Sequence, residues 1–208
     1  MSGRWGAVPL EDALTVLWGC VASGRGFLPL RWWHETEGRQ EHDVSSPRRF
    51  RGLIQHLGVE HELSIPACCR HERARGAAAG EIFSVWVRCE SGESGERLGR
   101  FRPGPTIVLR EGGAARRTAF WAVTRRHTVE QALRANRRLA HSLRAPKKHG
   151  SPDDFWFAPC GTFLRDGRAR PVPVVVESCT GAVYRPREVY GWLRDAPDPD
   201  AWRNREAA

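Results

Sequence analysis

The stretch EIFSVWVRCE, residues 81–90, decides the fold of this chain. Its apolar side chains alternate with a period of two, the spacing that places successive side chains of a strand on opposite faces of a sheet. One side carries Phe83, Val85, Val87 and Cys89, and the other side carries Ile82 and Trp86. The stretch therefore predicts a strand with apolar residues on both of its faces.

Two more strands follow this one along the chain. Pro105–Arg110 and Thr118–Thr124 are largely apolar and bracket the pair Gly112-Gly113, which is a turn signal between the two strands of a hairpin. We expect all three strands to share one sheet. Between the first strand and the hairpin, Ser91–Gly95 is rich in glycine and serine and is interpreted as a solvated loop.

A helix over 128–144 is predicted from its start and from its periodicity. Thr128 can cap the N-terminus, and Gln131 three residues later completes a capping box. The residues expected to face the sheet are Val129, Ala132, Leu133, Ala140 and Leu143. On the other side lie Arg134, Arg137, Arg138 and His141. The helix is therefore amphipathic, with its basic side toward solvent.

The remaining elements flank this sheet. We expect helices over Leu10–Trp18 and from Ser46-Pro47 to Leu57, strands over Phe27–Trp33 and His61–Pro66, extended segments over Asp154–Pro159 and Pro171–Glu177, and a short helix over Pro186–Asp195. No linker divides the chain. The sequence thus predicts one α+β domain over residues 1–195, with a central, mostly antiparallel sheet flanked by helices, followed by a tail over 196–208.

Positive charge is concentrated in one part of the chain. The protein has 33 basic and 24 acidic residues, a net charge of +9, and residues 116–148, the basic segment, carry a net +9 on their own. The candidate nucleic-acid-binding residues are Arg116, Arg117, Arg125, Arg126, Arg134, Arg137, Arg138, Arg144, Lys147 and Lys148, against one acid, Glu130. A confined basic surface predicts a polyanionic partner, DNA or RNA. The alternative is a solvated face in an arginine-rich protein.

The composition predicts a soluble protein of the cytoplasm that does not contact a membrane. No apolar run approaches the ~20 residues of a membrane span. Glu11 and Asp12 stand where a signal peptide would need its apolar core. The six cysteines include no Cys-x-x-Cys pair, so we expect reduced, partly buried thiols rather than a zinc site.

In their order along the chain, several motifs resemble those of the archaeo-eukaryotic primase superfamily, especially the primase-polymerase domains of plasmids, phages and mobile elements. The matching motifs are ALTVLWG (13–19), GFLPLR (26–31), SIPACCR (64–70), PTIVL (105–109), TAFW (118–121), APCGTF (158–163) and RPVPVVV (170–176). The resemblance implies an RRM-like primase palm that binds DNA or RNA. It also implies a role in DNA replication of a mobile element, alongside other replication proteins.

The chain departs from this family at the positions that carry its chemistry. The two metal-binding acids of the family, separated by one residue, fall at Arg88 and Glu90, so the first of them is an arginine. The family's histidine falls at Thr118, and its third acid falls at Asp153 or Asp154. If the site is active, the resemblance implies Glu90 and Asp154 as catalytic residues and as ligands of Mg²⁺ or Mn²⁺.

The arginine at position 88 argues against catalysis. Nucleotidyl transfer by two metals needs carboxylates that hold two divalent cations a few ångström apart, and a guanidinium directed into that site repels them. The first hypothesis is therefore a nucleic-acid-binding, primase-polymerase-like domain without activity and without a cofactor. Two alternatives stay open, namely an active nucleotidyltransferase with rearranged ligands and a protein-interaction module that uses its basic helix.

Overall fold

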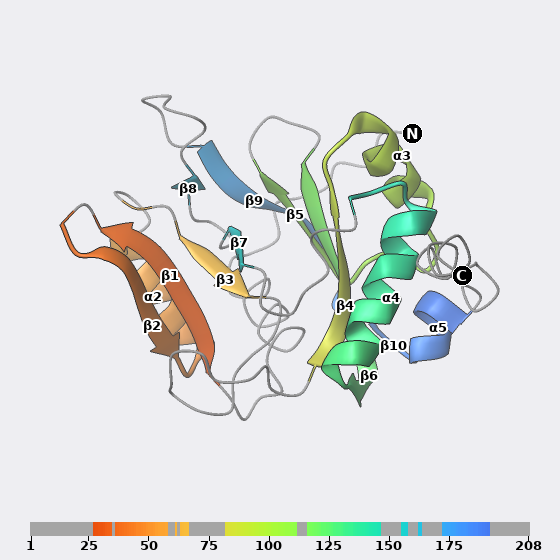
Figure 1. Cartoon of the computed structure of the whole chain (residues 1–208), viewed down its shortest axis with the longest axis horizontal. Helices are drawn as coiled ribbons and strands as arrows, with labels where there is room; N and C mark the ends of the chain where they lie inside the picture. The colour runs from red at the N-terminus through yellow and green to blue at the C-terminus, as the bar shows by residue number, and fades with distance from the viewer. Residues whose placement is uncertain are drawn as a thin grey trace, which may run out of the picture.

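Figure 1 shows the computed structural model of the chain, which describes residues 27–34, 36–57, 61, 63–66, 82–111, 116–146, 155–157, 162–163 and 172–191. Two mainly antiparallel sheets with helices packed against them make up this part. The predicted α+β class is confirmed, with two sheets where the sequence predicts one. Outside the described residues fall the predicted helix at 10–18, the tail, and the site candidates Lys147, Lys148, Asp153 and Asp154. Within them, no helix is long and apolar enough to cross a membrane.

The larger sheet contains the three strands predicted from the middle of the chain. β6 (Arg117–His127) lies between β4 (Ile82–Cys89) and β5 (Ile107–Glu111) and is antiparallel to both. Beyond β5 the sheet continues through β9 (Val172–Cys179) and β8 (Thr162–Phe163), while β10 (Val183–Tyr184) runs parallel to β6. The prediction that the three central segments share one sheet is confirmed.

The smaller sheet is built mostly from the N-terminal half of the chain. Its strand order is β2 (Gly38–Val44), β1 (Leu28–His34), β3 (Ser64–Pro66) and β7 (Phe155–Phe157). β1 and α2 (Pro47–Leu57) confirm the predicted strand and helix. β2 has no counterpart among the predicted strands, because its sequence GRQEHDV shows no apolar alternation. It forms because it pairs residue by residue with β1, after a turn in which Gly38 has a φ of 69°.

Two apolar cores lie on opposite faces of β4. The core that joins the two sheets includes Leu30, Phe50, Ile65 and Trp86. The core on the other face, beneath the helix α4 (Val129–Ser142), includes Val85, Val87, Cys89 and Leu139. The two-faced apolar pattern of residues 82–89 is thus confirmed. β4 and its sheet form a middle layer between the smaller sheet, with α2 beside it, and α4 (Figure 1).

α4 packs on β4 and β6 through small side chains. Its predicted capping box is present, since Thr128 Oγ1 accepts from the Gln131 N–H while the Gln131 side chain accepts from the Thr128 N–H. The buried residues of the helix are Ala132, Ala135, Asn136, Leu139 and Ala140. Val129 is 40% exposed, so its predicted inward position is wrong. The buried stripe starts one turn later, at Ala132, and runs with helical spacing from there.

The predicted loop at Ser91–Gly95 is also wrong, because the chain forms α3 (Gly92–Arg100) there. Ser91 caps the helix by accepting from the Ser94 N–H, and the Ser91 N–H donates to Ser94 Oγ. Leu98 is buried in the core beneath α4. At Gly95 a Cβ would lie 3.1 Å from Arg117 Nη1, so glycine leaves room for the Arg117 guanidinium. Cap and packing together outweigh the low helix propensity of the glycines.

Asn136 connects α4 to the edge of β4 that faces away from β6. Its Oδ1 accepts a 2.9 Å hydrogen bond from the Trp86 N–H, and both residues are buried. Replacement by Asn136→Leu removes this acceptor and leaves a buried donor, so we expect the free energy of unfolding to fall by about 1–3 kcal/mol. Urea denaturation measures the loss. The control Arg137→Gln, on the exposed side, should change it by less than about 0.5 kcal/mol, and an equal effect of both variants contradicts this role of Asn136.

The burial of His127 predicts how the stability of the protein depends on pH. Its ring is buried at the end of β6 and contacts the Tyr190 hydroxyl of α5 (Pro186–Tyr190), with the two ring centroids 5.7 Å apart. Burial lowers the pKa of His127 from its ordinary value of 6.5, because it disfavours the charged imidazolium. The unfolded chain then binds the proton more readily than the folded chain. The contribution of His127 to stability is therefore fully present above the pKa that it has in the unfolded chain. It is lost as the pH falls through the lower pKa that it has in the folded chain.

We expect the melting temperature to drop as the pH is lowered from about 7 to about 5, and to drop less steeply in His127→Gln. Thermal unfolding of both proteins across this range measures the difference in slope. Parallel curves for the two proteins would show that His127 does not titrate as its burial requires.

Candidate functional site

Three charged side chains meet where β4 and β5 end. Arg88 donates from Nη2 to Glu111 Oε2 at 2.6 Å, and its Nε lies 3.5 Å from Glu90 Oε1. The side chains of Arg88, Glu90 and Glu111 are 12%, 27% and 3% exposed. We call these three residues the strand-end cluster. It includes both positions at which the resemblance puts metal-binding acids, and adds a third residue.

Strand geometry explains why these residues meet. On β4, Arg88 follows Trp86 with a period of two and so lies on the face that packs toward the smaller sheet. On β5, Glu111 follows Leu109 onto the same face. Thr118 on β6 is the register partner of both Arg88 and Leu109. The Arg88 side chain thus reaches across β6 to bond Glu111.

The electrostatics of Glu111 reflect this position. Burial raises the pKa of its carboxyl group, while the nearby guanidinium groups of Arg88 and Arg116 oppose the rise and the negative charge of Glu90 adds to it. The two carboxylates are therefore close enough to repel each other, and Arg88 contacts both. Arg88 is the shared counter-ion of the pair.

Thr118 occupies the position at which the resemblance puts a histidine. It is buried, and its Oγ1 has no hydrogen-bond partner among the described residues. A threonine hydroxyl does not gain or lose a proton near pH 7, unlike an imidazole. This position therefore lacks the acid–base and charge properties that a histidine would supply.

The described residues do not fit a centre for two divalent metals. No group of three or more histidine, cysteine, aspartate or glutamate side chains that could hold a metal occurs among them. Of the two predicted ligands, Glu90 is in the strand-end cluster beside a guanidinium, and Asp154 falls outside the described part of the chain. The chemistry of the donor set is wrong at its centre, where a cationic side chain takes the place of an acid.

Sequence reasoning missed Glu111. The signal for it is an acid two residues after the apolar run at 107–109 and directly before Gly112-Gly113. That placement identifies a strand end next to a turn. It does not reveal that the strand lies on the far side of β6 from Arg88, since this depends on strand order.

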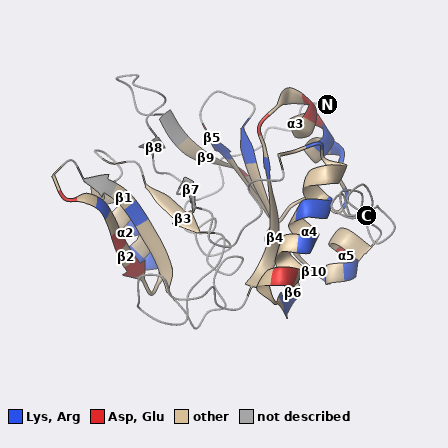
Figure 2. Cartoon of the chain, in the orientation of Figure 1, with Lys and Arg blue, Asp and Glu red and all other residues tan. Residues whose placement is uncertain are grey.

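The structure separates the basic segment into exposed and enclosed arginines. The exposed ones are Arg125 and Arg126 at the end of β6, Arg134 and Arg137 on α4, and Arg144 just after it. Figure 2 shows the basic positions along α4 in blue. Half-buried are Arg116, Arg117 and Arg138. Arg117 makes a bidentate ion pair with Glu177 on β9, with its Nε at 2.6 Å. The predicted solvent position of Arg138 is wrong in part, because its Nε is buried.

Exposed arginines also make ion pairs, as Arg134 and Arg144 show. Arg134 pairs with Glu130 one helical turn earlier at 2.8 Å. Arg144 contacts Glu93 on α3 at 2.7 Å, and the same carboxylate accepts from Arg97 at 3.2 Å. Exposed pairs of this kind contribute little to stability. They leave most guanidinium N–H donors available to a phosphate.

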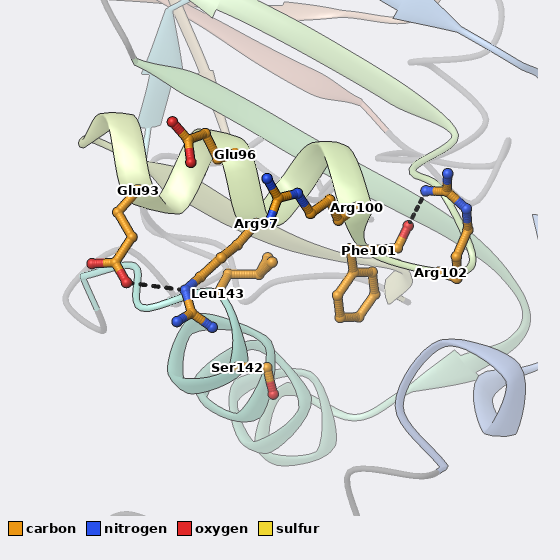
Figure 3. Close-up of a pocket in the computed structure, with 8 residues that line it drawn as sticks. All are labelled: Glu93, Glu96, Arg97, Arg100, Phe101, Arg102, Ser142 and Leu143. Carbon is orange, nitrogen blue, oxygen red and sulfur yellow. Dashed lines mark hydrogen bonds and ion pairs between the residues drawn. The ribbon is translucent and has the colours of Figure 1, made fainter.

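A pocket of about 500 Å³ lies between α3 and the end of α4 (Figure 3). Its lining includes Arg97, Arg100 and Arg102, with Phe101 and Leu143 between the two helices. The sequence analysis did not select these arginines, since their assignment requires that 92–100 be helical. They extend the positive surface of α4 onto α3.

No protein-family model matches the chain, and no curated protein matches its sequence. Solved structures do. The primase-polymerase AEP domain of cyanophage S-2L superposes with a TM-score of 0.64 at 14% identity, over 87% of this chain and 94% of that one. The RepB' primase superposes with a TM-score of 0.62 at 13% identity, over 95% of this chain but only 65% of the RepB' chain. The RepB' catalytic domain in complex with initiator DNA has a TM-score of 0.59 at 14% identity, over 96% and 97% of the two chains.

The chain has an archaeo-eukaryotic primase fold. The family resemblance of the motifs is thereby confirmed at the level of architecture. At 13–14% identity the likeness concerns the fold alone, so residue roles have to be argued from the geometry of this primase fold itself.

Proposed function

We propose that this chain is a nucleic-acid-binding, primase-like domain that does not catalyse nucleotidyl transfer and that serves DNA replication of a mobile element. Its partners are DNA or RNA and other replication proteins, and it works in the cytoplasm. The observation that carries the proposal is the ion pairing of Arg88, within a primase fold, at the end of the strand where the motif requires an acid.

The argument against catalysis is electrostatic. A divalent cation placed beside Glu90 also lies beside the Arg88 guanidinium, and like charges at such distances repel strongly in a partly buried site. Glu111 does not restore a ligand set, because it already accepts from Arg88. Thr118 supplies no proton transfer. The residues at this site favour an internally paired cluster over metal-dependent chemistry.

The support for nucleic-acid binding is the distribution of exposed arginines. Arg134 and Arg137 lie on α4, and the pocket at its C-terminal end adds three more guanidinium groups, those of Arg97, Arg100 and Arg102. Arg125 and Arg126 lie at the other end of the sheet, where β6 ends. Arginine binds phosphate well because its planar group donates two parallel hydrogen bonds. Contacts of this kind give affinity without sequence preference. One of the similar structures, the RepB' catalytic domain, is a complex with initiator DNA, which makes nucleic acid the first ligand to test.

The absence of catalysis is testable with purified protein. We expect neither primer synthesis nor primer extension on single-stranded templates, with Mg²⁺ or with Mn²⁺, because Arg88 occupies a ligand position. The assay measures labelled product on a denaturing gel. Robust synthesis that Glu90→Gln abolishes would instead establish the alternative, an active nucleotidyltransferase with rearranged ligands.

The binding surface is testable with a charge-matched pair of variants. In Arg134→Gln/Arg137→Gln, two exposed arginines of α4 lose their charge. We expect weaker binding to every sequence and a slope of log K against log salt that is flatter by about 1.4–1.8, from about 0.7–0.9 for each phosphate contact. Fluorescence anisotropy with labelled oligonucleotides at several salt concentrations measures both.

The control variant is Arg48→Gln/Arg49→Gln, which removes the same charge from exposed positions of α2 beside the smaller sheet. It should keep the affinity and the slope of the wild type. Equal losses in both variants mean that only net charge matters. No loss in either variant favours the protein-interaction module, whose basic helix meets an acidic protein instead.

A further inference from the structure

The strand-end cluster contains two carboxylates whose repulsion has to be balanced. Glu111 is buried and Glu90 is partly exposed, and the charge of each is felt by the other. Two converging carboxylates of this kind need a cation between them, although β6 separates the strands that bring them together. The cation in this chain is covalently attached, since Arg88 contacts Glu111 at 2.6 Å and Glu90 at 3.5 Å.

We propose that the Arg88 guanidinium is a tethered cation that replaces a metal ion between Glu90 and Glu111, and that these two carboxylates form a latent divalent-cation site which Arg88 keeps closed. The inference rests on the proposed function and deepens it. It states what makes the centre inert and which residues take up a metal once the guanidinium is removed.

The geometry requires a long, positively charged side chain at position 88. β6 separates β4 from β5, and Thr118 of β6 is level with Arg88 and Leu109. Glu111 lies two residues beyond Leu109 along β5, so the backbones of Arg88 and Glu111 are more than two strand spacings, about 10 Å, apart. An aspartate at 88 is too short to span this distance, whereas the arginine side chain spans it and bonds Glu111.

Charge and burial indicate that the cluster is neutralised internally. Arg116 lies near Glu111, so among the described residues two arginines and two glutamates interact here. A buried carboxylate without a counter-ion is strongly disfavoured. When the Arg88 charge is removed, Glu111 and Glu90 regain the need for a cation from solution, and hard oxygen ligands favour Mn²⁺ or Mg²⁺.

The test compares Arg88→Met with Arg88→Lys in the full chain, with no nucleic acid and no nucleotide present. Methionine keeps approximate length and removes the charge, whereas lysine keeps both. Mn²⁺ binding is followed by electron paramagnetic resonance and by the melting temperature. We expect Arg88→Met to bind Mn²⁺ at least about tenfold more tightly than wild type, and to be stabilised by it. Wild type and Arg88→Lys should show neither effect.

Two double variants assign the gain to this site rather than to acids elsewhere on the chain. Both Arg88→Met/Glu111→Gln and Arg88→Met/Glu90→Gln should lose the added Mn²⁺ binding. A gain that survives in both doubles overturns the proposal, as does wild-type binding equal to that of Arg88→Met. If Arg88→Met is unfolded without metal, Mn²⁺ should restore its circular dichroism spectrum, and failure to do so also overturns it.

Failure of this inference is distinguishable from failure of the proposed function. The Mn²⁺ titration needs no catalysis, whereas the proposed inactivity fails by the appearance of primer synthesis in the wild-type chain. If the wild type makes no primers and Arg88→Met gains no Mn²⁺ binding, the proposed function still stands. Only the proposal of a tethered cation is then overturned.

Discussion

The burial of β4 on both faces is the constraint on which the rest of the structure depends. Trp86 is fully buried in the core that joins the two sheets, while Val85 and Val87 are buried beneath α4. A slip of one residue in the pairing with β6 would exchange the two sets of side chains. It would also turn Arg88 into the core beneath α4. The packing of Trp86 therefore decides which side of the sheet carries the strand-end cluster.

The same strand explains how the helical layer is attached. Among the described residues, β4 pairs with β6 alone. About half of the N–H and C=O groups of β4 therefore point away from β6, at an edge where no described strand pairs with them. Asn136 accepts from one of them, the Trp86 N–H, within the buried interface of α4. A buried polar contact of this kind specifies position more than it adds stability. It aligns α4 along the sheet and so determines which arginines of the helix reach solvent.

Local patterns predicted β4, β5, β6 and β9 of the larger sheet but not the short strands β8 and β10, and tertiary contacts explain the failures. Period-two alternation identified β4, and the capping residue Thr128 identified the start of α4. The same reasoning missed β2, whose polar sequence becomes a strand only through its pairing with β1. It also missed α3, because glycine-rich composition does not reveal that Leu98 is buried. Where contacts with distant residues determine the secondary structure, a window of ten residues does not contain the information needed to predict it.

The candidate site shows the same division between local and long-range information. Arg88 and Glu90 were found because the motif is local, and Glu111 was not, because it joins them across an intervening strand. The basic segment was read from the sequence as one surface, yet Arg117 pairs with Glu177 on a distant strand and Arg138 is half-buried. Counting charges along the chain predicts the sign of a surface well. It does not separate arginines that bind a partner from those that neutralise acids of the fold.

The Arg88–Glu111 pair also bears on why a primase fold would retain such a site. A buried ion pair often contributes no more stability than two well-packed apolar residues, because desolvation of both charges offsets their attraction. Stability alone therefore does not account for it. A guanidinium attached to the chain neutralises the carboxylates at any concentration of free metal, so the charge at the end of the sheet stays constant. Under the proposed function, recognition of a nucleic acid then depends on the exposed arginines of α3 and α4, and not on whether a metal is bound.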